Sequence, residues 1–177
     1  MGRIAYVDGR YSPHQDAAVH VEDRGFQFSD GVYEVAVCID GTLVDLNSHL
    51  DRLERSLSEL EITPPTTRKV LEMLMKQLLT RNGVRDGLIY IQVTRGTAPR
   101  DHAFPANVKP TLVMTTKRVD YLHQKNILEG VKIVTTPDLR WARCDIKSVS
   151  LLPNCSAKTE ARRAGAGEAW MVDLDGY

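Results

Sequence analysis

Residues 32–46 read V-Y-E-V-A-V-C-I-D-G-T-L-V-D-L. The first part, up to Ile39, is rich in β-branched side chains, which are typical of strands. Asp40-Gly41 is the strongest short-range signal for a hairpin turn, and residues 42–46 then return as a second strand. This stretch therefore predicts a β-hairpin within an α/β fold.

Two amphipathic helices are predicted to follow the hairpin. Asn47 or Ser48 can cap the first helix, and Pro64-Pro65 stops it. Thr66 or Thr67 can cap the second. Apolar side chains recur at helical spacing in both segments, namely Leu50, Leu53, Leu57 and Leu60 in the first and Leu71, Leu74, Met75 and Leu78 in the second. Each helix is therefore expected to bury one face.

Further strands are predicted on both sides of these elements. They are residues 4–7, 18–21, 88–94 and 110–116. The last two are joined by a long polar loop, residues 95–109, and loops of this length are uncommon without a functional reason. We expect a two-layer α+β domain over residues 1–118.

A second domain is expected to begin after a linker at residues 119–130. Residues 131–177 hold, in order, a strand at 131–135, a loop through Lys147, a helix at 151–164 with Pro153 in its first turn, and a strand at 168–174. Asp175-Gly176 then opens a hairpin that the sequence does not complete. We therefore expect an incomplete second domain in a chain truncated on its C-terminal side.

Composition narrows the class of protein. Lys+Arg and Asp+Glu both count 23, and this balance argues against a nucleic-acid-binding protein, which normally carries a basic surplus. Cys38, Cys144 and Cys155 show no C-x-x-C spacing, so neither a disulfide framework nor a metal site is expected. No apolar run approaches membrane-spanning length. The expected location is the cytoplasm, with no membrane partner.

Lys147 lies in R-W-A-R-C-D-I-K-S-V-S-L-L, residues 140–152. A lysine is usually a solvated surface residue, but this one lies in an apolar run with Arg140 and Arg143 upstream. Burial and nearby positive charge both favour the neutral amine, which is the form that makes an imine with an aldehyde. Taken alone, the segment leaves both interpretations open.

Three further segments hold candidate binding residues. Residues 22–34, E-D-R-G-F-Q-F-S-D-G-V-Y-E, are typical of a shaped loop, or of an ordinary loop whose aromatic residues fill the core. Arg100 and His102 are two residues apart, which puts both side chains on one side of an extended loop. There they can hold a carboxylate or simply be solvated. Arg52, in N-S-H-L-D-R-L, lies off the leucine stripe, where it can form a surface ion pair with a neighbouring acid.

Together these segments, in this order, resemble the fold-type IV enzymes that use pyridoxal 5'-phosphate (PLP), the class IV aminotransferases. The matching motifs are E-D-R-G-x-Q-F-x-D-G-V-Y-E, H-x-D-R-L, Q-V-T-R-G-T-x-P-R-x-H and R-W-x-R-C-D-I-K-S. The family includes D-amino-acid transaminases, branched-chain aminotransferases and aminodeoxychorismate lyases. The D-amino-acid transaminase type is the most similar to this sequence.

The resemblance implies a role for each candidate residue. Lys147 would form the internal aldimine with PLP and move the proton between substrate and cofactor, and Arg52 would bind the PLP phosphate. Tyr33 would lie beside the lysine and bind the substrate carboxylate together with Arg100 and His102, a pair that comes from the partner subunit in the family. The implied protein is a homodimer with a second domain of pseudo-barrel character. The implied reaction is transamination of a D-amino acid, such as D-alanine, with a 2-oxo acid.

Alternatives remain open within the resemblance. An aminodeoxychorismate lyase or a branched-chain aminotransferase would use the same fold, although the Arg100/His102 pair favours a D-amino-acid enzyme. A non-catalytic fragment is a further alternative, because the family's acidic partner of the pyridine nitrogen and its phosphate loops lie beyond Tyr177. Cys155-Ser156 also departs from the family, which usually has apolar residues there.

Overall fold

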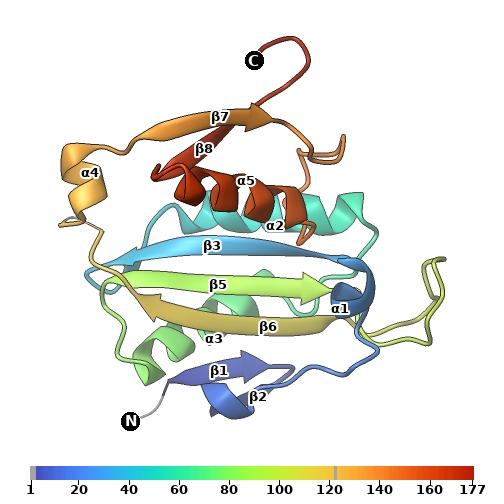
Figure 1. Cartoon of the computed structure of the whole chain (residues 1–177). Coiled ribbons are helices and arrows are strands. Elements are labelled where there is room, and N and C mark those ends of the chain that lie inside the picture. The colour runs from blue at the N-terminus through green and yellow to red at the C-terminus, as the bar shows by residue number, and fades with distance from the viewer. Residues whose placement is uncertain (1–2, 122) are drawn as a thin grey trace. The chain divides into compact units, whose positions relative to one another are not determined.

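The computed structural model describes residues 3–121 and 123–177 (Figure 1). The chain divides into two compact units. The first consists of Met1–Asp120 together with Ile146–Val149, and the second of Tyr121–Asp145 and Ser150–Tyr177. Lys147 therefore belongs to the first unit, although it lies far along the chain from the rest of that unit.

The first unit is built on a six-stranded antiparallel sheet with the order β2-β1-β6-β5-β3-β4. The strands are β1 (Ile4–Val7), β2 (Arg10–Pro13), β3 (Gly31–Ile39), β4 (Thr42–Leu43), β5 (Gly87–Thr94) and β6 (Thr111–Arg118). β3 and β5 pair over eight residues, from Gly31 opposite Thr94 to Cys38 opposite Gly87. This long pairing holds the start of β3, where the candidate site lies, against the end of β5.

Two helices cover one face of this sheet, α2 (Leu46–Glu59) and α3 (Arg68–Arg81) (Figure 1). The core between the layers contains buried side chains from both helices and from alternate positions of the strands, including Leu50, Leu53, Leu57, Leu71, Met75, Leu78, Val32, Ala36, Ile89, Ile91 and Val93. The helical spacing of the leucines therefore predicted the buried faces of both helices. Thr67 is the N-cap of α3, as one of the two expected caps.

The hairpin begins as predicted, but its second strand is shorter. Asp40 and Gly41 form the turn with φ angles of 47° and 79°, the left-handed conformation that such a turn requires. β4 ends at Leu43 because the chain turns at Asp45, also left-handed, and α2 begins at Leu46. The predicted strand at 42–46 was too long, and the cap of α2 is neither Asn47 nor Ser48.

The predicted strand at residues 18–21 was wrong. The turn after β1 is so tight that Val7 pairs with Arg10, and the partner strand β2 therefore starts eight residues earlier than expected. A short 3-10 helix follows at His14–Asp16. Val19 and Val21 are exposed, so apolar character alone was not evidence for a strand.

The second unit contains a β-α-β arrangement. β7 (Ile133–Pro137) and β8 (Glu168–Val172) pair in parallel and are connected through α5 (Leu152–Arg163), which has Pro153 in its first turn as expected. The expected linker contains α4 (Lys125–Glu129). Residues 173–177 form a turn in which the Asp173 amide donates to the Tyr177 carbonyl. Among the described residues, no helix is both long and apolar enough to cross a membrane.

Candidate functional site

Lys147 lies on a short segment that adds to the free edge of β3. β4 pairs only with Cys38 and Ile39 at the far end of β3, which leaves the edge open where β3 begins. The Tyr33 amide donates to the Lys147 carbonyl at 3.0 Å, and the Val149 amide donates to the Gly31 carbonyl at 3.0 Å. An edge strand carries unpaired backbone N–H and C=O groups that pair readily with another segment. These two hydrogen bonds therefore fix the backbone of Lys147 to the sheet.

Helix α2 supplies a second anchor for this segment. The Lys147 amide donates to Ser56 Oγ at 3.3 Å, and Ser56 is fully buried. The two neighbours of the lysine, Ile146 and Ser148, are also buried, whereas Lys147 itself is half-buried. The side chain is thus presented from a rigid backbone rather than from a mobile loop.

The side chain of Lys147 meets Tyr33. Its Nζ donates to the Tyr33 hydroxyl at 3.3 Å and lies 4.4 Å from the centre of the Tyr33 ring. The hydroxyl and the ring both hold the amine at one place beside β3. A lysine amine held in this way can act as a nucleophile or as a proton carrier once it is neutral.

Tyr33 is itself held by β5. Its ring stacks on Tyr90 with centres 5.6 Å apart, and the Tyr90 hydroxyl donates to Gln92 Oε1 at 2.8 Å. Burial, with a smaller contribution from Tyr33, raises the pKa of Tyr90 to about 12. Tyr90 is therefore a neutral hydrogen-bond donor near neutral pH, and it fixes the position of Tyr33.

Arg52 forms a two-pronged ion pair with Glu34. Its Nε and Nη2 donate to the two Glu34 carboxylate oxygens at 2.5 and 2.9 Å, and His49 Nδ1 lies 2.9 Å from Glu34 Oε2. Burial opposes ionisation of Glu34, but the hydrogen bonds from Arg52 and His49 outweigh it and hold the pKa of that carboxyl below its ordinary value. Arg52 is thus paired with a fully buried acid of β3 rather than with a neighbour on its own helix.

This ion pair leaves Arg52 able to bind an anion. A guanidinium has five N–H donors, and of the Arg52 nitrogens only Nε and Nη2 donate to Glu34. The side chain of Arg52 is 45% exposed, whereas that of Glu34 is not exposed at all. Glu34 therefore acts as the buried support of a cation whose outer donors face solvent.

Arg100 and His102 lie together on the loop between β5 and β6. The guanidinium carbon of Arg100 is 4.7 Å from the centre of the Phe28 ring, and the His102 ring is 5.6 Å from it. Both side chains are exposed. The two-residue spacing thus brings them against one ring, and both remain open to a ligand.

Two separate groups of candidate residues result. The first holds Lys147 in contact with Tyr33, together with Arg52, which interacts electrostatically with Tyr33, and the second holds Arg100 and His102. No hydrogen bond, ion pair or ring contact joins the two groups within residues 3–121 and 123–177. The Lys147 segment pairs with the start of β3, and the loop of Arg100 and His102 follows the end of β5, which pairs with the start of β3. Both segments therefore lie toward the same end of the sheet as α1 (Arg24–Phe28) (Figure 1). Phe26 in α1 is 75% exposed, so the idea that the aromatic residues of this segment fill the core was wrong.

The family described as "Amino-transferase class IV" matches residues 31–177. This chain belongs to the class IV aminotransferase family. A relative in that family, the D-alanine aminotransferase of Staphylococcus epidermidis, is 42% identical over 165 residues, which are 93% of this chain and 58% of the relative. The chain thus spans somewhat more than half the length of this relative.

Solved structures show the same fold. The branched-chain amino acid aminotransferase of Escherichia coli covers the whole of this chain with a TM-score of 0.87, at 18% identity and over 62% of its own length. The branched-chain aminotransferase of the archaeon Thermoproteus uzoniensis, solved with norvaline, gives 0.81 at 20% identity, covering 99% of this chain and 60% of its own. The expected mixed α/β fold of fold-type IV aminotransferases is therefore confirmed.

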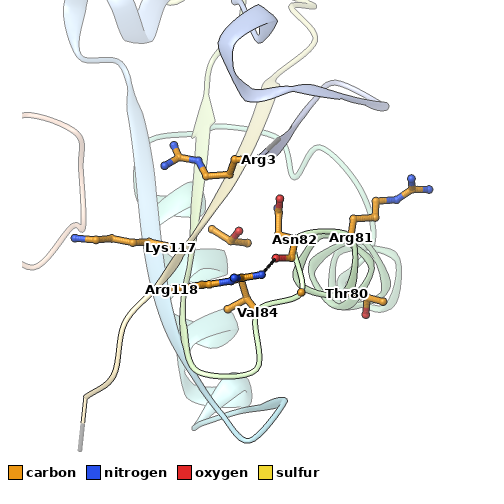
Figure 2. A pocket seen from close by; sticks show the side chains of 9 residues that line it. Arg3, Thr80, Arg81, Asn82, Val84, Lys117 and Arg118 are labelled. Carbon is orange, nitrogen blue, oxygen red and sulfur yellow. Dashed lines mark hydrogen bonds between the residues drawn. The ribbon is translucent and has the colours of Figure 1, made fainter. Parts of the chain in front are cut away.

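A hollow of about 670 Å³ lies elsewhere in this aminotransferase-family chain, beside the end of α3 (Figure 2). Two of its cations contact neutral groups, since Arg118 donates to the Asn82 carbonyl at 2.9 Å and Arg81 lies 4.3 Å from the Tyr11 ring. None of the five candidate residues lines this hollow. It is therefore not the site predicted from the sequence.

Sequence reasoning missed the partners that hold the candidates in place. Glu34 and Tyr90 were not singled out, although Glu34 lies among the core-facing positions of β3 and Tyr90 alternates with the core positions of β5. An acid at a core position of a strand is rarely left without a partner, so Glu34 could have indicated a buried cation nearby.

Proposed function

We propose that the protein is a PLP-dependent transaminase that acts on a D-amino acid, such as D-alanine, and a 2-oxo acid. The observation that carries this proposal is the Lys147 amine held 3.3 Å from the Tyr33 hydroxyl, with the supported cation Arg52 in the same unit. The 42% identity to a D-alanine aminotransferase favours this substrate class.

The residues present fit the two ends of PLP. A half-buried amine suits its aldehyde, and an arginine with free donors on a buried carboxylate suits its phosphate. When bound, PLP supplies an electron-withdrawing ring that stabilises negative charge on the substrate α-carbon. Arg52 would hold the phosphate, and Lys147 would bind the aldehyde carbon.

Lys147 would move the proton, and Tyr33 would hold Lys147 in position for that transfer. Lys147 Nζ would take the proton from the substrate α-carbon. Tyr33 would keep Nζ beside that carbon through its hydroxyl, and Tyr90 would keep Tyr33 in place. Proton transfer needs such fixed geometry before it needs any particular acidity.

Arg100 and His102 would bind the substrate carboxylate, and we propose that they serve the site of the partner subunit in a homodimer. Arginine offers charged donors in a planar fork, and histidine adds one more donor. If Arg100 and His102 hold the substrate carboxylate, its position determines which face of the α-carbon is turned toward Lys147. The pair therefore favours a D-amino-acid transaminase over a lyase or a branched-chain enzyme.

Borohydride trapping tests the proposal. PLP is added to the protein, the mixture is reduced with borohydride, and the masses of the digested peptides are measured by mass spectrometry. We expect the cofactor mass on the peptide that contains Lys147, and none on this peptide in Lys147→Ala. Trapping on the exposed Lys76 instead, or equal labelling of many lysines, would refute the assignment.

A further inference from the structure

Two buried arginines beneath the loop of Arg100 and His102 share one carboxylate. Arg24 is 2% exposed and Arg95 is 6% exposed. Arg24 Nε donates to Asp30 Oδ2 at 2.7 Å, and Arg95 donates to both oxygens of Asp30 at 2.8 and 3.0 Å. Burying two cations for one acid is costly, so the remaining donors need partners.

Those partners are backbone carbonyls of two separate segments. Arg24 donates to the carbonyls of Asp101 and His102 at 2.6 and 3.4 Å. Arg95 donates to the carbonyls of Leu60 and Glu61, after α2, at 2.7 and 3.0 Å. Through Asp30 the cluster therefore ties the tip of the loop to the body of the first unit.

Helix α1, which carries Arg24, is itself fixed to the end of β5. A Cβ at Gly25 would lie 2.2 Å from Thr94 Cγ2, so only glycine allows this approach. Thr94 Oγ1 donates to the buried Asp23 carboxylate at 2.8 Å, and the Arg24 amide donates to the Gly96 carbonyl at 2.9 Å. Arg24 is thus anchored before it reaches the loop.

The other end of α1 supplies the ring on which the loop rests. The Phe28 ring centre lies 4.8 Å from the guanidinium carbon of Arg24 and 4.7 Å from that of Arg100, and the His102 ring stands 5.6 Å away. One ring therefore contacts the buried arginine and both exposed side chains.

We propose that Arg24 and Phe28 are positioning residues for the Arg100–His102 pair, and that Asp30 and Arg95 hold Arg24 in place. The inference rests on the proposed function, in which the pair binds the substrate carboxylate. Arg24 fixes the backbone at His102, and Phe28 fixes the two side chains. Donors that are ordered before the substrate arrives lose less freedom on binding.

Two conservative variants test this in the PLP-loaded protein. Arg24→Lys keeps the charge but loses the planar fork, and Phe28→Leu keeps an apolar side chain but loses the ring. We expect each to raise KM for D-alanine by about tenfold while kcat changes less than about twofold. The visible absorbance of bound PLP should not change. Arg85→Lys, an exposed arginine paired with Asp40, is the matched control.

A triple variant shows whether Arg24 acts through the pair. In an Arg100→Ala, His102→Ala background, Arg24→Lys should raise KM no further, because the groups that it positions are gone. Independent effects that multiply would overturn the proposal. If Arg24→Lys does not fold, Phe28→Leu is tested in the same Arg100→Ala, His102→Ala background instead.

Hydrogen exchange without PLP separates this inference from the proposed function. Amides of residues 97–109 should exchange faster in Arg24→Lys than in the unsubstituted protein, and those of β5 should be unchanged. Unchanged exchange in the loop would overturn the positioning role. If the unsubstituted protein transaminates no D-amino acid, the proposed function fails, while the exchange result still decides whether Arg24 orders the loop.

Discussion

The groups around Lys147 and around Arg100 are built in different ways. Lys147 sits on backbone paired to β3, and Arg52 is held by a carboxylate with no exposed surface. Arg100 and His102 are exposed side chains on a long loop, ordered by one ring and by a buried arginine. A cofactor that stays bound suits rigid elements, whereas a substrate that enters and leaves suits a loop.

The largest expected effect is loss of turnover in Lys147→Ala. The amine is the only group of the Lys147 region proposed to carry the proton, so transamination should fall by at least about a thousandfold. The rate of D-alanine consumption measures this. Lys76→Ala, an exposed lysine of α3, should keep full activity, and normal turnover by Lys147→Ala would refute its role.

The second-largest expected effect is a loss of stability when the buried support of Arg52 is changed. Glu34→Gln removes the buried charge that supports Arg52, and we expect the free energy of unfolding to fall by about 2–3 kcal/mol. Urea unfolding measures it. Glu54→Gln, which weakens an exposed ion pair between α2 and Arg68, should cost less than about 0.5 kcal/mol. Equal losses would mean that burial of Glu34 is unimportant.

Arg100→Ala and His102→Ala should affect substrate rather than cofactor. Each loses a hydrogen bond to the carboxylate worth roughly 1–3 kcal/mol, or about 5- to 150-fold in KM. A PLP titration should be unaffected by either change, whereas Arg52→Ala should lose PLP affinity. Loss of PLP binding by Arg100→Ala with unchanged substrate affinity would contradict the assignment of Arg100 to the substrate.

The smallest effect is the pH dependence that Glu34 confers. Its pKa is held below the ordinary carboxyl value in the folded protein. Its contribution to stability is therefore full above the unfolded pKa and is lost as pH falls through the folded pKa. The stability difference between the unsubstituted protein and Glu34→Gln should shrink between about pH 7 and pH 3. A constant difference over that range would contradict the shift.

Local patterns predicted most of the elements, whereas the resemblance to the family supplied the roles of the candidate residues. The β-branched run before Asp40-Gly41 and the leucine spacing of α2 depend on near neighbours only, and both were confirmed. The contact of Lys147 with Tyr33 joins positions 114 residues apart; no periodicity encodes it, and it was expected only from the resemblance to the family. Glu34 beneath Arg52 and Arg24 beneath His102 were missed for the same reason, because each contact is made by the fold.

Two of the errors came from apolar residues that are exposed in the structure. Val19 and Val21 favoured a strand, and Phe26 allowed a core position, yet all three are exposed. An apolar residue is not by itself evidence of burial, since much of a protein surface is apolar.

The half-reaction with D-alanine tests the central claim most directly. PLP-loaded protein is mixed with D-alanine without any 2-oxo acid, and the visible absorbance of the lysine-bound cofactor is followed. We predict that D-alanine abolishes this band, that a 2-oxo acid restores it, and that L-alanine leaves it unchanged. An equal response to L-alanine, or no response to D-alanine, would contradict a D-amino-acid transaminase built on Lys147.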